Sequence, residues 1–324
     1  MRTAVVLDDW EQAWATSAAA DRLMQARTEL TISADRLSPT AGSAADRQRL
    51  GGLLQDAEIL VLNRERTPVD RQLLALAPKL EAIFNTGIGL DHVDRAAVAD
   101  RNIVVHATGG ESWPSVVEQT FALLLGCVKR TAQLDGAVRG GHFPQPVLEE
   151  LYGTRLGIAG MGEIGSRVGQ VAQVFGMSVY GWSRSLVHQD VRPSGVTVVP
   201  SLVELAAASD VLTLHLRLTP ETREIVDAGV IGALRPGAIL INTARAALID
   251  RRAVDQRLRR GDLSVGLDVF PSEPVPPGDT VLAAPGTLSP HVGWMTHGTW
   301  RRFIDSCVHN ILSWLDENPA PQRN

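Results

Sequence analysis

The sequence predicts an α/β protein with two doubly wound parallel-sheet domains, one flavodoxin-like and one of Rossmann type, the second inserted in the first. Two series of short apolar runs alternate with helical patterns, and a long apolar helical pattern lies between the series. The runs are almost continuously apolar, which is typical of strands in a parallel sheet whose two faces are covered by helices. A chain of 324 residues is long enough for two such domains.

The elements follow in order along the chain. The first series predicts strands at 3–7, 58–62, 81–85 and 102–106, with a helical pattern at 71–76. Residues 115–137 contain few helix breakers and predict a connecting helix. The second series predicts strands at 156–159, 177–182, 211–216, 238–242, 264–269 and 286–289. A last helix at 299–318 returns to the first domain. We therefore expect a first domain of residues 1–102 and 291–324, and a second domain of residues 103–290.

Composition excludes several classes of function. The chain is 44% hydrophobic with a net charge of -5, and it has no basic run of the kind that nucleic-acid binding needs. Its apolar stretches are too short to span a bilayer, and its first residues lack the apolar core of a signal peptide. Cys127 and Cys307 have no disulfide-framework or zinc-site spacing. We expect a cytoplasmic protein with no nucleic-acid partner, no membrane partner and no metal.

The most informative motif is G-x-G-x-x-G, which follows the apolar run at 156–159 and opens a helical pattern. It needs Gly160 for a tight turn, Gly162 for close approach to a pyrophosphate, and Gly165 for packing of the helix on the strand. The first amides of such a helix lack intrahelical partners and carry the positive end of its dipole, so they stabilise an anion. We therefore expect 103–290 to be the dinucleotide-binding domain, and 1–102 with 291–324 to be the substrate domain. The expected dinucleotide contacts are Gly160, Met161, Gly162, Glu163, Ile164 and Gly165.

The turn after the run at 177–182 bears on the choice of cofactor. Folds that prefer NAD place an acidic residue there, which accepts from the ribose hydroxyls, whereas this chain has Ser183, Arg184 and Ser185. Two hydroxyls and a guanidinium can bind the 2′-phosphate of NADP(H), which a carboxylate would repel. We therefore expect NADP(H) as the preferred cofactor and NAD(H) as the alternative. The competing interpretation is that Arg184 is only a solvated turn residue.

Three further motifs end later strands: N-T-A-R with Thr243 and Arg245, D-V-F-P-S-E-P with Asp268 and Glu273, and S-P-H with His291. In this order and spacing the chain resembles the D-2-hydroxyacid dehydrogenase family over nearly its whole length, and in type the NADP-dependent glyoxylate/hydroxypyruvate reductases. The resemblance implies that Arg245, Glu273 and His291 are catalytic. It also implies that Thr243 and Asp268 bind the cofactor, with Asp268 accepting from the nicotinamide carboxamide.

The resemblance extends to the first half of the chain. N-T-G-I-G-L-D-H-V-D at 85–94 is similar to the substrate loop of the family, which implies that Gly87, Ile88 and Gly89 bind the substrate carboxylate through backbone amides. Arg64 matches a loop that reaches a distal substrate anion in the phosphoglycerate dehydrogenase branch. The alternative for Arg64 is an ion pair with a nearby carboxylate at the surface.

These residue types suit the reduction of a 2-oxo acid. His291 is the candidate general acid, because imidazole gains and loses a proton near neutral pH. Glu273 would orient the ring and favour its protonated form through its negative charge. The planar guanidinium of Arg245 would bind the substrate carboxylate and polarise the carbonyl, while the nicotinamide supplies the hydride. The remaining histidines, such as His215, show no metal-ligand spacing.

We therefore expect an NAD(P)H-dependent oxidoreductase that interconverts a small 2-oxo acid and its D-2-hydroxy acid, reducing with NADPH. We also expect a homodimer joined through the cofactor domain, because the apolar connecting helix at 115–134 would otherwise leave surface uncovered. Two alternatives stay open. The first is oxidation of another small anion such as formate or phosphite, which needs no general acid. The second is a cofactor-sensing transcriptional co-regulator, against which the complete catalytic set argues.

Overall fold

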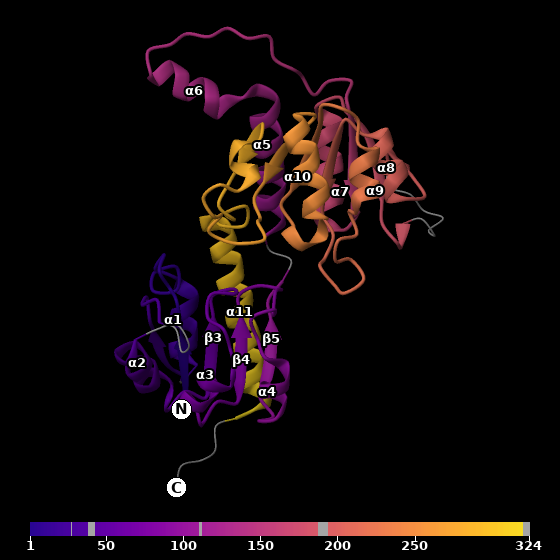
Figure 1. Ribbon diagram of the computed structural model, residues 1–324. Helices are drawn as coiled ribbons and strands as arrows, with labels where there is room; N and C mark the ends of the chain where they lie inside the picture. The colour runs from indigo at the N-terminus through magenta and orange to yellow at the C-terminus, as the bar shows by residue number, and fades with distance from the viewer. Residues whose placement is uncertain (27, 38–42, 110–111, 187–193, 320–324) are drawn as a thin grey trace. The chain divides into compact units, whose positions relative to one another are not determined.

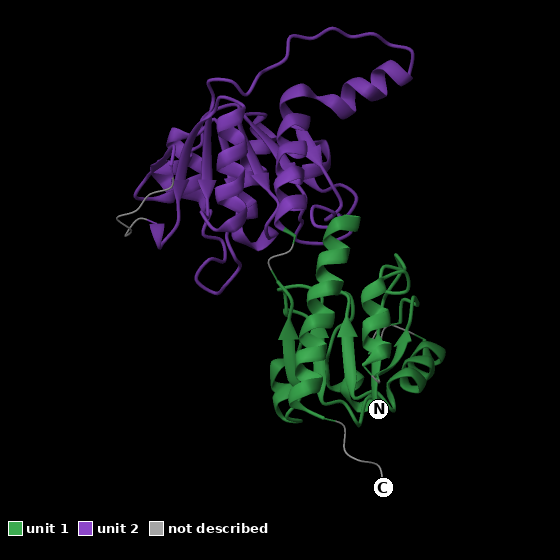
Figure 2. Ribbon diagram, turned by 180° about the vertical axis from the view of Figure 1, so that it is seen from behind, with its two compact units in different colours: residues 1–112, 295–324 green, residues 113–294 purple. Residues whose placement is uncertain are grey.

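The structure is a computed structural model that describes residues 1–26, 28–37, 43–109, 112–186 and 194–319. The chain forms two compact α/β units (Figures 1 and 2). Unit 1 comprises Met1–Ser112 and Met295–Asn324, and unit 2 comprises Trp113–Trp294. Unit 2 is thus inserted between two parts of unit 1, as expected for the two doubly wound domains. The assignment of 1–102 with 291–324 to substrate binding and of 103–290 to cofactor binding stays a prediction.

Unit 1 contains a five-stranded parallel sheet with the strand order β2-β1-β3-β4-β5, which is the flavodoxin-like order. Its strands are β1 (Arg2–Val6), β2 (Thr28–Ile32), β3 (Ile59–Leu62), β4 (Ala82–Asn85) and β5 (Val104–Ala107). Its helices are α1 (Ala18–Gln25), α2 (Ala44–Leu54), α3 (Arg71–Leu76), α4 (Arg95–Ala99) and α11 (His297–Glu317). The apolar strands β3 and β4 are buried along their whole length, as their composition predicts.

The helices of unit 1 begin at short polar side chains that accept from first-turn amides. Asp70 caps α3 in this way, Asp94 caps α4 and Thr296 caps α11. The last helix packs its apolar face on the sheet, where Trp314 meets Phe84 of β4 edge to face at 6.3 Å between ring centroids. The prediction of a final helix that returns to the first domain is therefore confirmed. No helix in the described part of the chain is both long and apolar enough to cross a membrane.

Unit 2 contains a seven-stranded parallel sheet with the order β12-β11-β10-β9-β6-β7-β8. Its strands are β6 (Arg155–Ala159), β7 (Ser178–Trp182), β8 (Val196–Val198), β9 (Val211–Leu214), β10 (Ala238–Asn242), β11 (Leu263–Leu267) and β12 (Gly286–Leu288). Its helices are α5 (Trp113–Lys129), α6 (Thr131–Arg139), α7 (Glu163–Val174), α8 (Leu202–Ala208), α9 (Ala228–Ala233) and α10 (Arg251–Arg260), with 3₁₀ turns η2 (Ala246–Leu248) and η3 (Thr280–Ala283). The order reverses between β6 and β9, as in a Rossmann fold with one added strand, β12.

The structure corrects the connecting helix expected at 115–137. Arg130 adopts a left-handed backbone conformation with φ 50° and ψ 36°, and this break divides the segment into α5 and α6. The apolar face of α5 is covered within unit 2, where Phe121, Leu123 and Leu124 belong to the core. The reason given for a homodimer therefore does not hold for α5. By contrast, α6 has no buried residue, and Figure 1 shows that it projects from the rest of unit 2.

Candidate active site

The glycine-rich turn joins β6 to α7, and its geometry needs glycine at two positions. Gly160 has φ +101°, and a Cβ there would lie 2.5 Å from the His215 carbonyl oxygen. A Cβ on Gly165 would lie 1.9 Å from the Gly160 carbonyl oxygen, so the helix could not pack so closely on the turn. Gly162 caps α7 without any side-chain hydrogen bond, and a Cβ there would meet nothing within 4 Å. The space beside Gly162 at the start of α7 is therefore open, and helix N-termini of this kind suit a pyrophosphate.

The other residues of the turn leave this space to the backbone. The side chains of Met161 and Ile164 pack against the core of unit 2, and Glu163 is exposed. The backbone of the motif is therefore the part that remains available to a dinucleotide. The expected binding by backbone amides rather than cationic side chains stays a prediction.

The turn after β7 presents Ser183, Arg184 and Ser185, of which the last two are exposed. The Ser183 hydroxyl accepts from the Leu186 amide at 3.2 Å and lies 3.4 Å from the Ser185 hydroxyl. Ser183, Arg184 and Ser185 bring no carboxylate to the described part of this turn. A hydrogen bond from Thr219, together with the charge of Arg184, lowers the pKa of Glu221 in the loop after β9. Arg184 thus lies within electrostatic reach of that loop as well.

The three expected catalytic residues follow three adjacent strands of one sheet. Arg245 follows β10, Glu273 follows β11 and His291 follows β12. The Asn242 side chain shapes the first of these loops, since it accepts from the Ala244 amide and donates to the Arg245 carbonyl, both at 2.9 Å. Because carboxyl ends of parallel strands meet at one edge of the sheet, the topology brings these loops to the same edge as the glycine-rich turn.

His291 and Glu273 are in direct contact. The imidazole Nδ1 lies 2.8 Å from Glu273 Oε2, and the other carboxylate oxygen of Glu273 accepts from the Phe270 amide at 3.0 Å. A carboxylate is acceptor-only, so the pair places the Nδ1 proton toward Glu273 and leaves Nε2 as the ring nitrogen that faces elsewhere. An apolar cavity of about 420 Å³ adjoins Glu273 and is lined also by Phe270, Val275, Leu282, Leu288 and Pro290.

Asp268 and Thr243, the expected cofactor residues at the ends of β11 and β10, both have protein partners. The Asp268 carboxylate is buried and accepts hydrogen bonds from the Ser289 hydroxyl and from two backbone amides. The Thr243 hydroxyl lies 3.2 Å from that of Thr120 in α5. Gln119, the residue before Thr120, donates to the Ser289 hydroxyl at 2.8 Å. Sequence reasoning found neither residue, because nothing in the helical pattern of α5 distinguishes their polar side chains from ordinary surface positions.

The predicted substrate residues Gly87, Ile88, Gly89 and Arg64 come together within unit 1. Asn85 holds the loop after β4 by donating to the carbonyls of Gly87 and Gly89 at 3.0 and 2.8 Å. The Arg64 side chain lies against this loop, since a Cβ on Gly87 would be 2.7 Å from its Nη1. Arg64 is 9% exposed and pairs with Glu65 at 3.3 Å. Arg64 is therefore a largely buried cation beside the loop, and it forms the ion pair with Glu65 that the alternative interpretation named. Its role in substrate binding stays a prediction.

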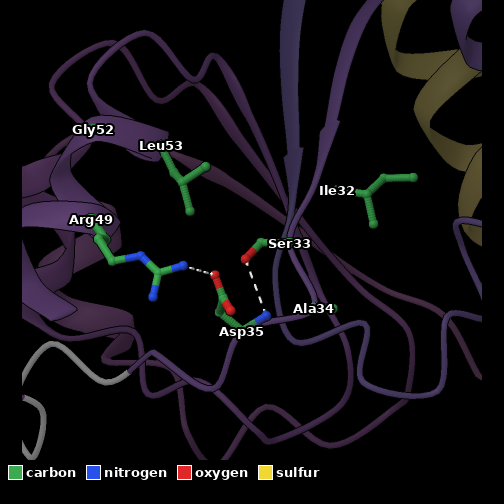
Figure 3. A pocket seen from close by; sticks show the side chains of 7 residues that line it. All are labelled: Ile32, Ser33, Ala34, Asp35, Arg49, Gly52 and Leu53. Atoms are coloured by element: carbon green, nitrogen blue, oxygen red, sulfur yellow. Dashed lines mark hydrogen bonds and ion pairs between the residues drawn. The ribbon is translucent and has the colours of Figure 1, made fainter.

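A hollow of about 370 Å³ in unit 1 lies away from these residues, between the end of β2 and α2. Figure 3 shows that Arg49 reaches toward the Asp35 carboxylate, with which it forms an ion pair, and that the Ser33 hydroxyl faces the Asp35 amide. Both charged groups are exposed and already paired with each other. None of the residues expected to act in binding or catalysis lines this hollow, so we do not assign the site to it.

His215 follows β9 and lies next to the glycine-rich turn. Its Nε2 is 2.9 Å from the Thr213 hydroxyl, and burial lowers the pKa of the ring to about 3, although part of the residue reaches the surface. The imidazole is therefore neutral at physiological pH. Among the described residues, no group of three or more His, Cys, Asp or Glu side chains is placed to hold a metal ion.

Comparison with known proteins decides the family. The profile of the family described as D-isomer specific 2-hydroxyacid dehydrogenase, NAD binding domain, matches residues 121–293. The chain belongs to the D-isomer specific 2-hydroxyacid dehydrogenases. Like the matched domain, unit 2 is a nicotinamide-dinucleotide-binding fold, and the resemblance inferred from the motifs is confirmed.

Several D-2-hydroxyacid dehydrogenases are similar over most of the chain. The hydroxypyruvate reductase of Thermotoga maritima is 31% identical, over 91% of this chain and 96% of that protein. The D-3-phosphoglycerate dehydrogenase of Methanocaldococcus jannaschii is 34% identical over 75% of this chain, which spans about half the length of that relative, 47%. The crystal structure of a glyoxylate reductase from Paecilomyes thermophila superposes with a TM-score of 0.79 at 27% identity, over 98% of this chain and 96% of that chain.

Proposed function

We propose that this protein reduces a small 2-oxo acid to its D-2-hydroxy acid with NADPH. The observation that carries the proposal is the 2.8 Å contact between His291 Nδ1 and Glu273, on the sheet that also holds the glycine-rich turn. Such a pair supplies a proton to a carbonyl oxygen, which oxidation of formate or phosphite does not require. A co-regulator that only senses the cofactor would have no use for it.

Each residue has a distinct task in the proposed mechanism. Bound reduced nicotinamide supplies the hydride. Protonated His291 donates from Nε2 to the carbonyl oxygen, while Glu273 holds Nδ1 and stabilises the positive ring. Arg245 binds the substrate carboxylate through its planar fork and stabilises negative charge on the carbonyl oxygen. The resemblance to the family implies that the backbone of the loop Gly87–Gly89 also binds substrate.

The preference for NADPH is supported by the turn Ser183–Arg184–Ser185. The turn has an exposed guanidinium and two hydroxyls, and it contributes no carboxylate to repel a 2′-phosphate. NAD(H) stays the alternative cofactor. Arg64 bears on which 2-oxo acids are accepted. A buried cation beside Gly87 suits a 2-oxo acid that carries a second anionic group.

The test is a panel of 2-oxo acids assayed with NADPH and with NADH at fixed pH. We expect NADPH consumption with at least one small 2-oxo acid, and comparison of hydroxypyruvate with its 3-phosphate reveals whether a second anion is favoured. The variant His291→Ala should have a kcat about 10²- to 10⁴-fold lower than that of wild type. Binding of NADPH, followed by its fluorescence, should be nearly unchanged, because the histidine acts on the substrate. Turnover of formate or phosphite alone, or NADPH binding without any turnover, would refute the proposal.

A further inference from the structure

The loop that carries His291 is fastened on both sides of the histidine. Two residues before it, the Ser289 hydroxyl donates to Asp268 Oδ1 at 2.5 Å. Directly after it, the amides of Val292 and Gly293 donate to the same carboxylate at 3.0 and 2.8 Å. Asp268 is 2% exposed, so these bonds are shielded from water. The carboxylate is therefore the anchor of the loop.

Two side chains of helix α5 extend this hydrogen-bond network. The Gln119 side-chain amide donates to the Ser289 hydroxyl at 2.8 Å, and the Ser115 hydroxyl donates to the Gly293 carbonyl at 2.7 Å. A serine hydroxyl has a single proton, and because Gln119 donates to its oxygen, that proton is directed to Asp268. Gly293 packs closely on Asp268, since a Cβ at this position would lie 2.7 Å from the Asp268 carboxylate.

The backbone of His291 shows why such an anchor is needed. Its φ is 57°, in the left-handed region that a residue with a side chain rarely adopts. A conformation of this kind persists only where the surroundings impose it. In this conformation the ring meets Glu273, so the direction of the ring depends on the conformation of the loop.

We propose that Gln119 and Ser289 are positioning residues, which act through Asp268 to hold His291 in line with Glu273 and the carbonyl to be reduced. The inference rests on the proposed function, in which His291 is the proton donor. Neither residue touches the reacting atoms. Their effect is to fix the place of a proton donor, and small misplacements of catalytic groups cost large factors in rate.

The experiment compares Ser289→Ala with Ser289→Thr and Gln119→Leu. Ser289→Ala and Gln119→Leu should each lower kcat about tenfold, with KM for the 2-oxo acid and the Kd of NADPH within about twofold of wild type. Ser289→Thr keeps the hydroxyl and should recover most of the rate. The double variant Ser289→Ala with Gln119→Leu should lose no more kcat than Ser289→Ala alone, because Gln119 acts on Asp268 through Ser289. Ser201→Ala, which removes the cap of α8 in the same unit, serves as the matched control.

Three outcomes would overturn the inference. They are wild-type kcat in Ser289→Ala, losses that multiply in the double variant, and a loss in Ser289→Thr or in the Ser201→Ala control as large as the loss in Ser289→Ala. A readout independent of turnover separates this result from a failure of the proposed function. In isotope-labelled protein without substrate, the NMR signals of the His291 ring at one fixed pH should move in Ser289→Ala toward their positions in Glu273→Gln. If these signals move while no 2-oxo acid is reduced, the proposed function fails and the positioning role stands.

Discussion

The contact between His291 and Glu273 makes a prediction for the pH dependence of the reaction. Reduction needs the protonated ring, and the carboxylate 2.8 Å away stabilises that form. Glu273→Gln removes the negative charge that stabilises the protonated ring. We therefore expect the alkaline limb of the kcat/KM profile to move to lower pH. An unchanged profile with a normal rate would show that the two residues do not work as a pair.

His215 makes a prediction for stability in acid. Its ring has a pKa of about 3 in the folded protein and about 6.5 in an unfolded chain. Below pH 6.5 the unfolded chain therefore binds a proton at His215 that the folded protein does not bind. The free energy of unfolding consequently decreases as pH falls toward 3. At pH 5 the loss is about 2 kcal/mol.

The variant His215→Gln tests this contribution, because its side chain can still reach the Thr213 hydroxyl but does not titrate. Urea denaturation followed by tryptophan fluorescence gives the free energy of unfolding at pH 7 and pH 5. The drop between the two pH values should be about 2 kcal/mol smaller in the variant. Equal drops in both proteins would show that His215 is not the group responsible.

At the scale of single residues, motif order indicated the candidate catalytic residues but not the residues that contact their loops. Arg245, Glu273 and His291 each end a recognisable run, so their positions follow from the strands before them. The contact of Gln119 with Ser289 joins side chains 170 residues apart, and no local sequence pattern indicates it. The roles assigned to all of these residues stay predictions.

Among the elements, the buried strands were the most predictable. The runs now seen as β3, β4 and β10 are apolar and mostly buried, whereas β2 and β8 were not predicted. β2 reads T-E-L-T-I and is only partly buried, and β8 is a three-residue strand at the edge of its sheet. Periodicity cannot separate such strands from loops. The break at Arg130 was equally hidden, because neither glycine nor proline marks it.

The turn after β7 carries the prediction on cofactor preference. In the double variant Ser183→Asp with Arg184→Ala, the loss of a charge-assisted contact should weaken NADPH binding by roughly 1.5–3 kcal/mol, and the new carboxylate adds repulsion. NADH lacks the 2′-phosphate and should bind nearly as before. The ratio of kcat/KM for NADPH over NADH should therefore fall about ten- to a hundredfold. Arg259→Ala on α10 removes an exposed arginine elsewhere in unit 2 and is the control. A wild type that already favours NADH, or an unchanged ratio, contradicts the assignment.

For the whole molecule we expect a homodimer. Unit 2 exposes large apolar side chains on α6 and the segment after it, where Val138, Phe143 and Val147 are 53%, 78% and 97% exposed. Light scattering at micromolar concentration should report twice the chain mass of 34.9 kDa. Phe143→Asp with Val147→Asp should shift the protein toward monomer, because charges would then have to be buried. Met24→Asp, at a 52% exposed methionine of unit 1, should leave it dimeric. A monomeric wild type would exclude the dimer.

The insertion of unit 2 into unit 1 has a consequence for synthesis on the ribosome. All five strands of unit 1 emerge by Ala107, but α11, whose Trp314 covers Phe84, begins only at His297. At about 5–20 residues per second, roughly 190 intervening residues take on the order of 10–40 s. During that interval the first sheet is exposed to solvent and chaperones on the side that α11 will cover. Unit 2, by contrast, is continuous in sequence, so it can fold as soon as it leaves the exit tunnel, before the domain that precedes it is finished.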